Sequence, residues 1–122
     1  MIKVLTIDDM EDITFSIKKT LEKVDSKYEV IRASTGTDGI SQAQTIKPDI
    51  ILVDLMMPDK SGWQIIKELK SNDVTKQIPI LIITAKSDEL SKQMGEYSTK
   101  GYIVKPFDPK DLDKKIKKLL AK

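Results

Sequence analysis

The sequence contains neither cysteine nor histidine among its 122 residues. Without cysteine, disulfide bonds and thiolate metal sites are excluded. Without histidine, the commonest general base and metal ligand is missing, so any chemistry must come from carboxylates, hydroxyls and lysines. Arg32 is the only arginine, which weighs against a surface that reads phosphates or bases through bidentate contacts.

Long hydrophobic runs are also missing. The longest, such as residues 50–53, have four residues, whereas a membrane-spanning helix needs about 20. Met1 leads directly into strand-like sequence, and no apolar segment of secretory length follows Lys3. We therefore expect a cytoplasmic protein that does not contact a membrane.

The composition is that of a compact domain with a heavily charged surface. Hydrophobic residues make up 39% of the chain and charged residues 33%, a balance that is not typical of disorder. No linker, repeat or low-complexity segment interrupts the chain, so we predict a single domain over residues 1–122. The net charge of +2 is too small to indicate nucleic-acid binding. The lysines between 110 and 122 are interpreted as the solvated face of a terminal helix.

Five short β-rich runs predict strands, at residues 2–7, 28–33, 49–53, 80–83 and 102–104. The third and fourth runs are continuously apolar, which is typical of a strand covered on both faces.

Segments with helical spacing lie between the strands. Ile13, Ile17, Leu21 and Val24 form one apolar stripe. Further helices are predicted at 35–46, 61–71, 88–99 and after Asp108. The segment 88–99 is the weakest, because Gly95 costs about 1 kcal/mol relative to alanine. Alternating strands and helices predict an α/β fold, a doubly wound (βα)5 domain with a parallel sheet.

Chemically capable side chains follow four of the five strands. Asp8 and Asp9 come after the first strand, Asp54 after the third, Thr84 after the fourth and Lys105 after the fifth. In open parallel sheets, ligands bind beyond the carboxyl ends of the strands. A cluster of carboxylates at this edge would suit a hard divalent cation such as Mg²⁺, which also accepts phosphate oxygens. Each residue alone has a structural alternative: helix cap, turn residue, capping hydroxyl or surface lysine.

These residues resemble the receiver domains of two-component response regulators, the CheY-like family. The motifs that carry the resemblance are Ile7-Asp8-Asp9, Asp54-Leu55-Met56-Met57-Pro58 with Gly62, Thr84-Ala85, and Tyr102 followed by Lys105-Pro106-Phe107. The resemblance covers essentially the whole chain and implies a flavodoxin-like sheet with strand order 2-1-3-4-5.

The resemblance also implies a role for each site residue. Asp54 matches the phosphoacceptor, a carboxylate that attacks phosphorus. Asp9 and Asp54 match direct ligands of Mg²⁺ or Mn²⁺, Asp8 a ligand through water, and Met56 a ligand through its backbone carbonyl.

Three further residues match the switch. Thr84 matches the hydroxyl that moves toward the phosphoryl group, and Lys105 matches the cation that pairs with that group. Tyr102 matches the aromatic residue that turns inward when Thr84 moves.

The predicted function is a phosphorylation-dependent signalling switch, not a turnover enzyme, that assists its own phosphorylation and autodephosphorylation. A histidine kinase or histidine phosphotransfer protein would supply phosphohistidine, and a downstream protein target or output domain would read the result. A phosphatase of the haloacid-dehalogenase type is the main alternative, but it requires an aspartate where Met56 stands. A flavodoxin-like cofactor carrier would need a phosphate-binding loop where Asp8 and Asp9 would repel phosphate. The sequence leaves open the kinase, the target, the phosphoryl lifetime, the oligomeric state, and whether the chain is a stand-alone regulator or part of a longer protein.

Overall fold

The computed structural model describes residues 2–25, 27–55, 59–84, 101–104 and 107–121. The elements, in chain order, are β1 (Ile2–Ile7), α1 (Glu11–Val24), β2 (Tyr28–Ala33), α2 (Gly36–Ile46), β3 (Ile50–Asp54), α3 (Gly62–Lys70), β4 (Ile80–Thr84), β5 (Gly101–Val104) and α5 (Pro109–Leu120). The helix predicted at 88–99 lies outside the described residues.

The five strands form one parallel sheet in the order β2-β1-β3-β4-β5, as the resemblance implied. β1 and β3 are adjacent, with Ile7 opposite Val53. The chain therefore winds outward from β1 in one direction and from β3 in the other. The carboxyl ends of β1 and β3 form the switch point at which such sheets bind ligands.

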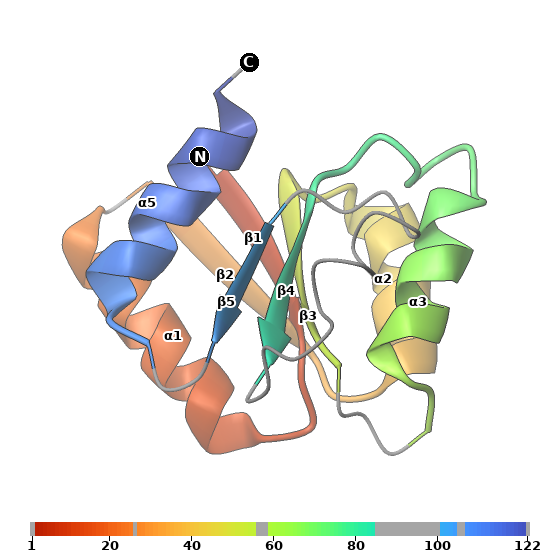
Figure 1. The fold of residues 1–122 in the computed structure, drawn as a ribbon, viewed down its shortest axis with the longest axis horizontal. Coiled ribbons are helices and arrows are strands. Elements are labelled where there is room, and N and C mark those ends of the chain that lie inside the picture. The colour runs from red at the N-terminus through yellow and green to blue at the C-terminus, as the bar shows by residue number, and fades with distance from the viewer. Residues whose placement is uncertain (1, 26, 56–58, 85–100, 105–106, 122) are drawn as a thin grey trace.

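Helices cover both faces of the sheet. Figure 1 shows α1 and α5 on one side and α2 and α3 on the other. In β3, Ile51 and Val53 pack into the core beneath α2 and α3, whereas Ile50 and Leu52 pack into the core beneath α1 and α5. All four side chains are fully buried, which explains the continuous apolar run. Burial of each stabilises the fold by roughly 1.5–3 kcal/mol.

The helix boundaries follow their capping residues where these exist. Thr35, Ser61 and Asp108 are the N-caps of α2, α3 and α5, and each side chain accepts a backbone hydrogen bond from the first turn. The predicted N-cap Asp108 is thus confirmed. α1 instead begins after Met10, without a side-chain cap. Its predicted stripe is only partly confirmed, because Val24, the last helical residue, is 41% exposed.

Within the described residues, none of the helices combines the length and the apolar character that crossing a membrane requires.

Candidate functional site

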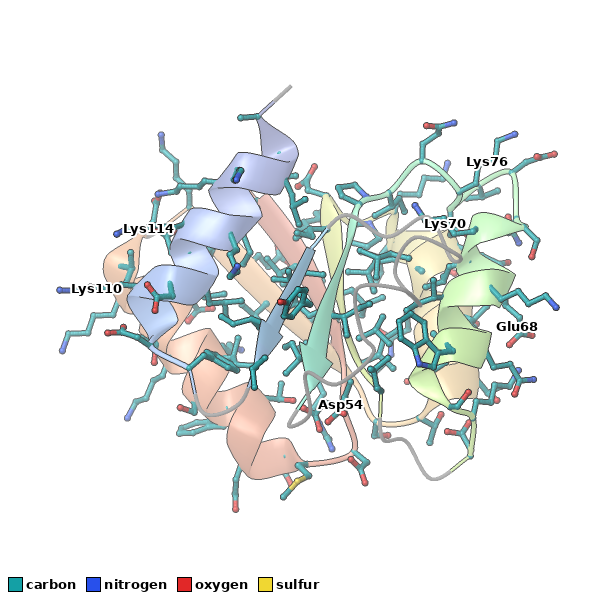
Figure 2. All side chains as sticks on the ribbon, viewed as in Figure 1. Asp54, Glu68, Lys70, Lys76, Lys110 and Lys114 are labelled. Atoms are coloured by element: carbon teal, nitrogen blue, oxygen red, sulfur yellow. The ribbon has the colours of Figure 1, made fainter. Side chains whose placement is uncertain are left out.

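Three carboxylates meet at the carboxyl end of the sheet. Asp8 follows β1 directly, Asp9 comes next, and Asp54 is the last residue of β3. One carboxylate oxygen from each lies within 4.8 Å of the other two. Asp8 and Asp54 are buried, with exposed fractions of 1% and 5%, whereas Asp9 is exposed. Figure 2 shows Asp54 at the edge toward which the strands point.

The register of the sheet produces this convergence. Because Ile7 pairs with Val53, the residues that follow them, Asp8 and Asp54, leave the sheet side by side. The amide of Asp8 still donates to the carbonyl of Ala33 in β2, at 3.1 Å. Asp8 is therefore held by the sheet itself.

Local hydrogen bonds fix the loop that carries the first two carboxylates. Oδ1 of Asp8 accepts from the amide of Met10 at 2.8 Å. The alternative in which these aspartates cap α1 is therefore not observed, since Met10 occupies the N-cap position. Nη2 of Arg32 donates to the backbone carbonyl of Asp9 at 3.3 Å.

The loop after Asp54 is folded back on the strand. The amide of Gly62 donates to the carbonyl of Leu55 at 3.0 Å. Farther out, the carboxylate of Asp59 accepts from the amides of Gly36 and Thr37 at 2.9 and 3.1 Å. The hydrogen bond from Gly36 is the main cause that holds the pKa of Asp59 below its usual value.

The donor set fits a hard divalent cation. Ionised carboxylates less than 5 Å apart repel by roughly 3–4 kcal/mol per pair at an effective dielectric near 20. Mg²⁺ and Mn²⁺ prefer oxygen ligands, and Mg²⁺ typically binds through one or two carboxylates while keeping several waters. Asp8, Asp9 and Asp54 offer such ligands from two adjacent strands.

The remaining predicted residues are only partly described. Thr84 is the last residue of β4 and pairs with Val104 of β5, but its side chain lies outside the described part of the chain. Lys105, which follows Val104, and Met56 also lie outside the described residues.

Tyr102 in β5 is half-buried and packs against the core beneath α2 and α3. Nζ of Lys115 lies 6.0 Å from the centroid of its ring. The expected half-buried position is confirmed, whereas its role in switching stays a prediction.

Two residues near the site escaped the sequence reasoning. Asp59 connects its loop to α2, a partner 23 positions away for Gly36. Arg32 contacts the backbone of Asp9 from β2. The one available signal for Arg32 was its position as the sole arginine, close to the carboxyl end of a strand.

Comparison with known proteins identifies the family. The model of the response regulator receiver domain matches residues 4–117. The chain is 36% identical over 98% of its length to the alkaline phosphatase synthesis transcriptional regulatory protein PhoP of Bacillus subtilis, of which it covers 49%. It is 34% identical to protein PilH of Pseudomonas aeruginosa, with 99% of each chain covered. The chain thus spans about half of the first relative and nearly all of the second.

Solved structures agree with these relatives. The chemotaxis protein CheY4 of Vibrio cholerae superimposes with a TM-score of 0.89 at 32% identity, with 98% of each chain covered. A response regulator from Chloroflexus aurantiacus gives a TM-score of 0.89 at 30% identity, again over 98% of each chain. The chain therefore belongs to the response regulator receiver domains of two-component signal transduction, whose family function is that of a phosphoacceptor.

Proposed function

We propose that Asp54 is the phosphoacceptor of this domain and that Asp8, Asp9 and Asp54 bind the divalent cation that the reaction needs. The observation that carries the proposal is the convergence of the three carboxylates at the switch point of the sheet, with one oxygen of each within 4.8 Å of the others. In this arrangement Asp9 and Asp54 bind Mg²⁺ or Mn²⁺ directly and Asp8 binds through water. The backbone carbonyl of Met56 completes the set.

The reaction is a phosphoryl transfer from phosphohistidine to a carboxylate. An oxygen of Asp54 attacks phosphorus, the new O–P bond forms, and the N–P bond to the donor imidazole breaks as that nitrogen takes back its electron pair. When bound, the cation offsets negative charge on the transferring phosphoryl group. β3 is buried between β1 and β4, so the backbone of Asp54 is held in place while the donor approaches.

Thr84 and Lys105 are proposed to contact the phosphoryl group once it is on Asp54. Thr84 ends the strand next to β3, and Val104, the residue before Lys105, pairs with it. The two strand ends thus lead toward the same edge as Asp54. Movement of Thr84 toward the phosphoryl group would allow Tyr102 to turn inward, which changes the surface around β5.

The proposed biological role is a switch read by another protein. We assign residues 1–122 to one receiver domain in the cytoplasm, phosphorylated by a histidine kinase or histidine phosphotransfer protein and read by a downstream target or output domain. The domain would assist its own phosphorylation and autodephosphorylation, without binding nucleic acid or a membrane itself. Relatives occur both as full-length matches and as parts of longer proteins, such as the hybrid signal transduction histidine kinase D of Dictyostelium discoideum, of which this chain covers 8%.

The test combines mass spectrometry with fluorescence. Acetyl phosphate with MgCl₂ should add one phosphoryl group to the wild type, and beryllofluoride with MgCl₂ should change the emission of Trp63, which is half-buried against the core directly after Gly62. Asp54→Asn should abolish both responses. Asp73→Asn is the matched control, because Asp73 is 93% exposed and is paired only with Lys76 among the ion pairs of the described residues. Equal responses in the wild type and Asp54→Asn would overturn the assignment.

A further inference from the structure

The carboxylate of Asp59 connects two loops that the chain separates widely. Its Oδ1 accepts from the amide of Gly36 at 2.9 Å, and its Oδ2 accepts from the amide and hydroxyl of Thr37 at 3.1 and 3.3 Å. Asp59 lies between Asp54 and α3, whereas Gly36 and Thr37 begin α2. The carboxylate therefore joins the loop after the proposed phosphoacceptor to the start of another helix.

This contact completes the capping of α2. The first four amides of a helix have no partners within it. Asp59 accepts from the first two, Thr35 Oγ1 accepts from the third, that of Asp38, at 3.0 Å, and the carbonyl of Thr35 accepts from the fourth, that of Gly39, at 2.9 Å. A negative charge is also favourable at a helix N-terminus. Asp59 thus supplies half of a cap from outside the helix.

The other anchors of the loop do not reach α2. Gly62 bonds back to Leu55, at the start of the same loop. Nζ of Lys60 contacts both carboxylate oxygens of Glu68 at 3.1 and 2.8 Å, which ties the loop to α3. Among these contacts, only that of Asp59 leads to the segment after β2.

That segment is the one that holds Asp8. Ala33 ends β2 and accepts from the amide of Asp8 at 3.1 Å, and Gly36 follows three residues later. A closed path therefore runs from Asp8 through Ala33 and Gly36 to Asp59, and back along the chain to Asp54. The carboxylates of the site are joined directly through the sheet on one side and through Asp59 on the other.

We propose that Asp59 is a positioning residue for the acidic site. By holding the loop after Asp54 against α2, it fixes the spacing of the carboxylates and of residue 56, and so sets the affinity for Mg²⁺. The proposal rests on the function proposed above, because it assumes that these carboxylates bind the cation.

The experiment measures the Mg²⁺ dissociation constant by calorimetric titration with MgCl₂ alone, without a phosphodonor, together with the thermal midpoint of unfolding. Asp59→Ala should weaken binding about tenfold, the effect typical of losing a group that orients metal ligands. Asp59→Asn keeps one acceptor oxygen and should give an intermediate loss. Thr35→Ala is the matched control, because it removes one capping hydrogen bond from the same helix but leaves the Asp59 contact in place.

The comparison separates positioning from helix stability. We expect Thr35→Ala to lower the thermal midpoint as Asp59→Ala does, with a Mg²⁺ affinity within about twofold of the wild type. Equal losses of affinity in Thr35→Ala and Asp59→Asn would overturn the proposal, because Asp59 would then act only as a cap. Should Asp59→Ala fail to fold, Asp59→Asn decides by the same criterion. A wild type that binds no Mg²⁺ would overturn both this proposal and the proposed function, whereas Mg²⁺ binding unaffected by either Asp59 variant would overturn this proposal alone.

Discussion

Gly62 lies in direct backbone contact with Leu55, the residue after the proposed phosphoacceptor. Its amide donates to the carbonyl of Leu55 at 3.0 Å. A Cβ atom on Gly62 would lie 2.5 Å from the Cα of Leu55 and 2.8 Å from the carbonyl oxygen of Asp54. Both are backbone atoms and have no rotamer to change. The close approach of α3 to the site therefore requires a residue without a side chain.

Gly62→Ala should lower the free energy of unfolding by about 1–3 kcal/mol, because the loop or α3 must shift to accept the methyl group. Urea unfolding measures this change. Gly36→Ala is the control, because its Cβ would meet only side-chain atoms, at 2.9 Å from Ile65 Cδ1 and 3.2 Å from Lys60 Cβ, and should cost less. A Gly62→Ala variant as stable as the wild type would show that the contact is easily relieved.

Mg²⁺ should stabilise the folded wild type, because it binds the folded carboxylate cluster and relieves its repulsion. At a free concentration of one hundred times the dissociation constant, the gain is about 2.7 kcal/mol. Asp9→Asn should raise the stability of the metal-free protein by up to about 1 kcal/mol, since Asp9 is exposed and its repulsion is screened. The same variant should lose most of the gain from Mg²⁺.

Urea unfolding with EDTA and with MgCl₂ measures both effects, and potassium chloride at equal ionic strength controls for screening. An undiminished Mg²⁺ gain in Asp9→Asn would remove Asp9 from the ligand set.

The sheet and the acidic cluster could be predicted because both follow from repeated patterns. β3 is apolar at every position from Ile50 to Val53, since each face packs under helices. A parallel sheet brings the ends of adjacent strands together, so Asp8 and Asp54 were expected to meet. Their measured proximity confirms that expectation.

The contacts that support the site could not be predicted in this way. Asp59 bonds to a helix 23 positions earlier through a loop, and loops have no periodicity that encodes a partner. The start of α1 was equally hidden, because Met10 occupies the N-cap and gives no capping signal. Such contacts depend on how the elements pack, which the order of residues does not show.

Tyr28 ties the start of β2 to α5 and should contribute measurably to stability. Its side chain is 3% exposed, and its hydroxyl donates to Oδ1 of Asp113 at 2.7 Å. Burial, followed by the bond to Asp113, raises the pKa of Tyr28 above its ordinary value, so the hydroxyl stays a donor throughout the neutral range. Tyr28→Phe should lower the free energy of unfolding by about 1–2 kcal/mol, because Asp113 keeps its ion pair with Lys117 at 3.3 Å.

A double-mutant cycle with Asp113→Asn, followed by urea unfolding, isolates this interaction. Additive effects of the two substitutions would mean that the hydrogen bond contributes nothing beyond the separate packing of each side chain.

The Asp59 carboxylate should make stability depend on pH in the acid range. Its pKa in the folded protein lies below the ordinary value of 3.8, chiefly because of the bond from Gly36. On acidification the unfolded chain therefore takes up the proton first. The stabilisation is fully present above pH 3.8 and is lost as the pH falls below that value through the folded pKa.

The wild type should therefore lose stability more steeply than Asp59→Asn over this acid range, and the difference between them should shrink toward the lowest pH. Urea unfolding at a series of pH values from about 5 to about 2.5 tests this. Thr35→Ala lacks a cap but retains the carboxylate, so its curve should lie below that of the wild type and parallel to it. If the Asp59→Asn curve were parallel to the wild type as well, the amides of Gly36 and Thr37 would not be favouring the ionised carboxylate. The bridge to α2 would then depend on shape rather than on charge.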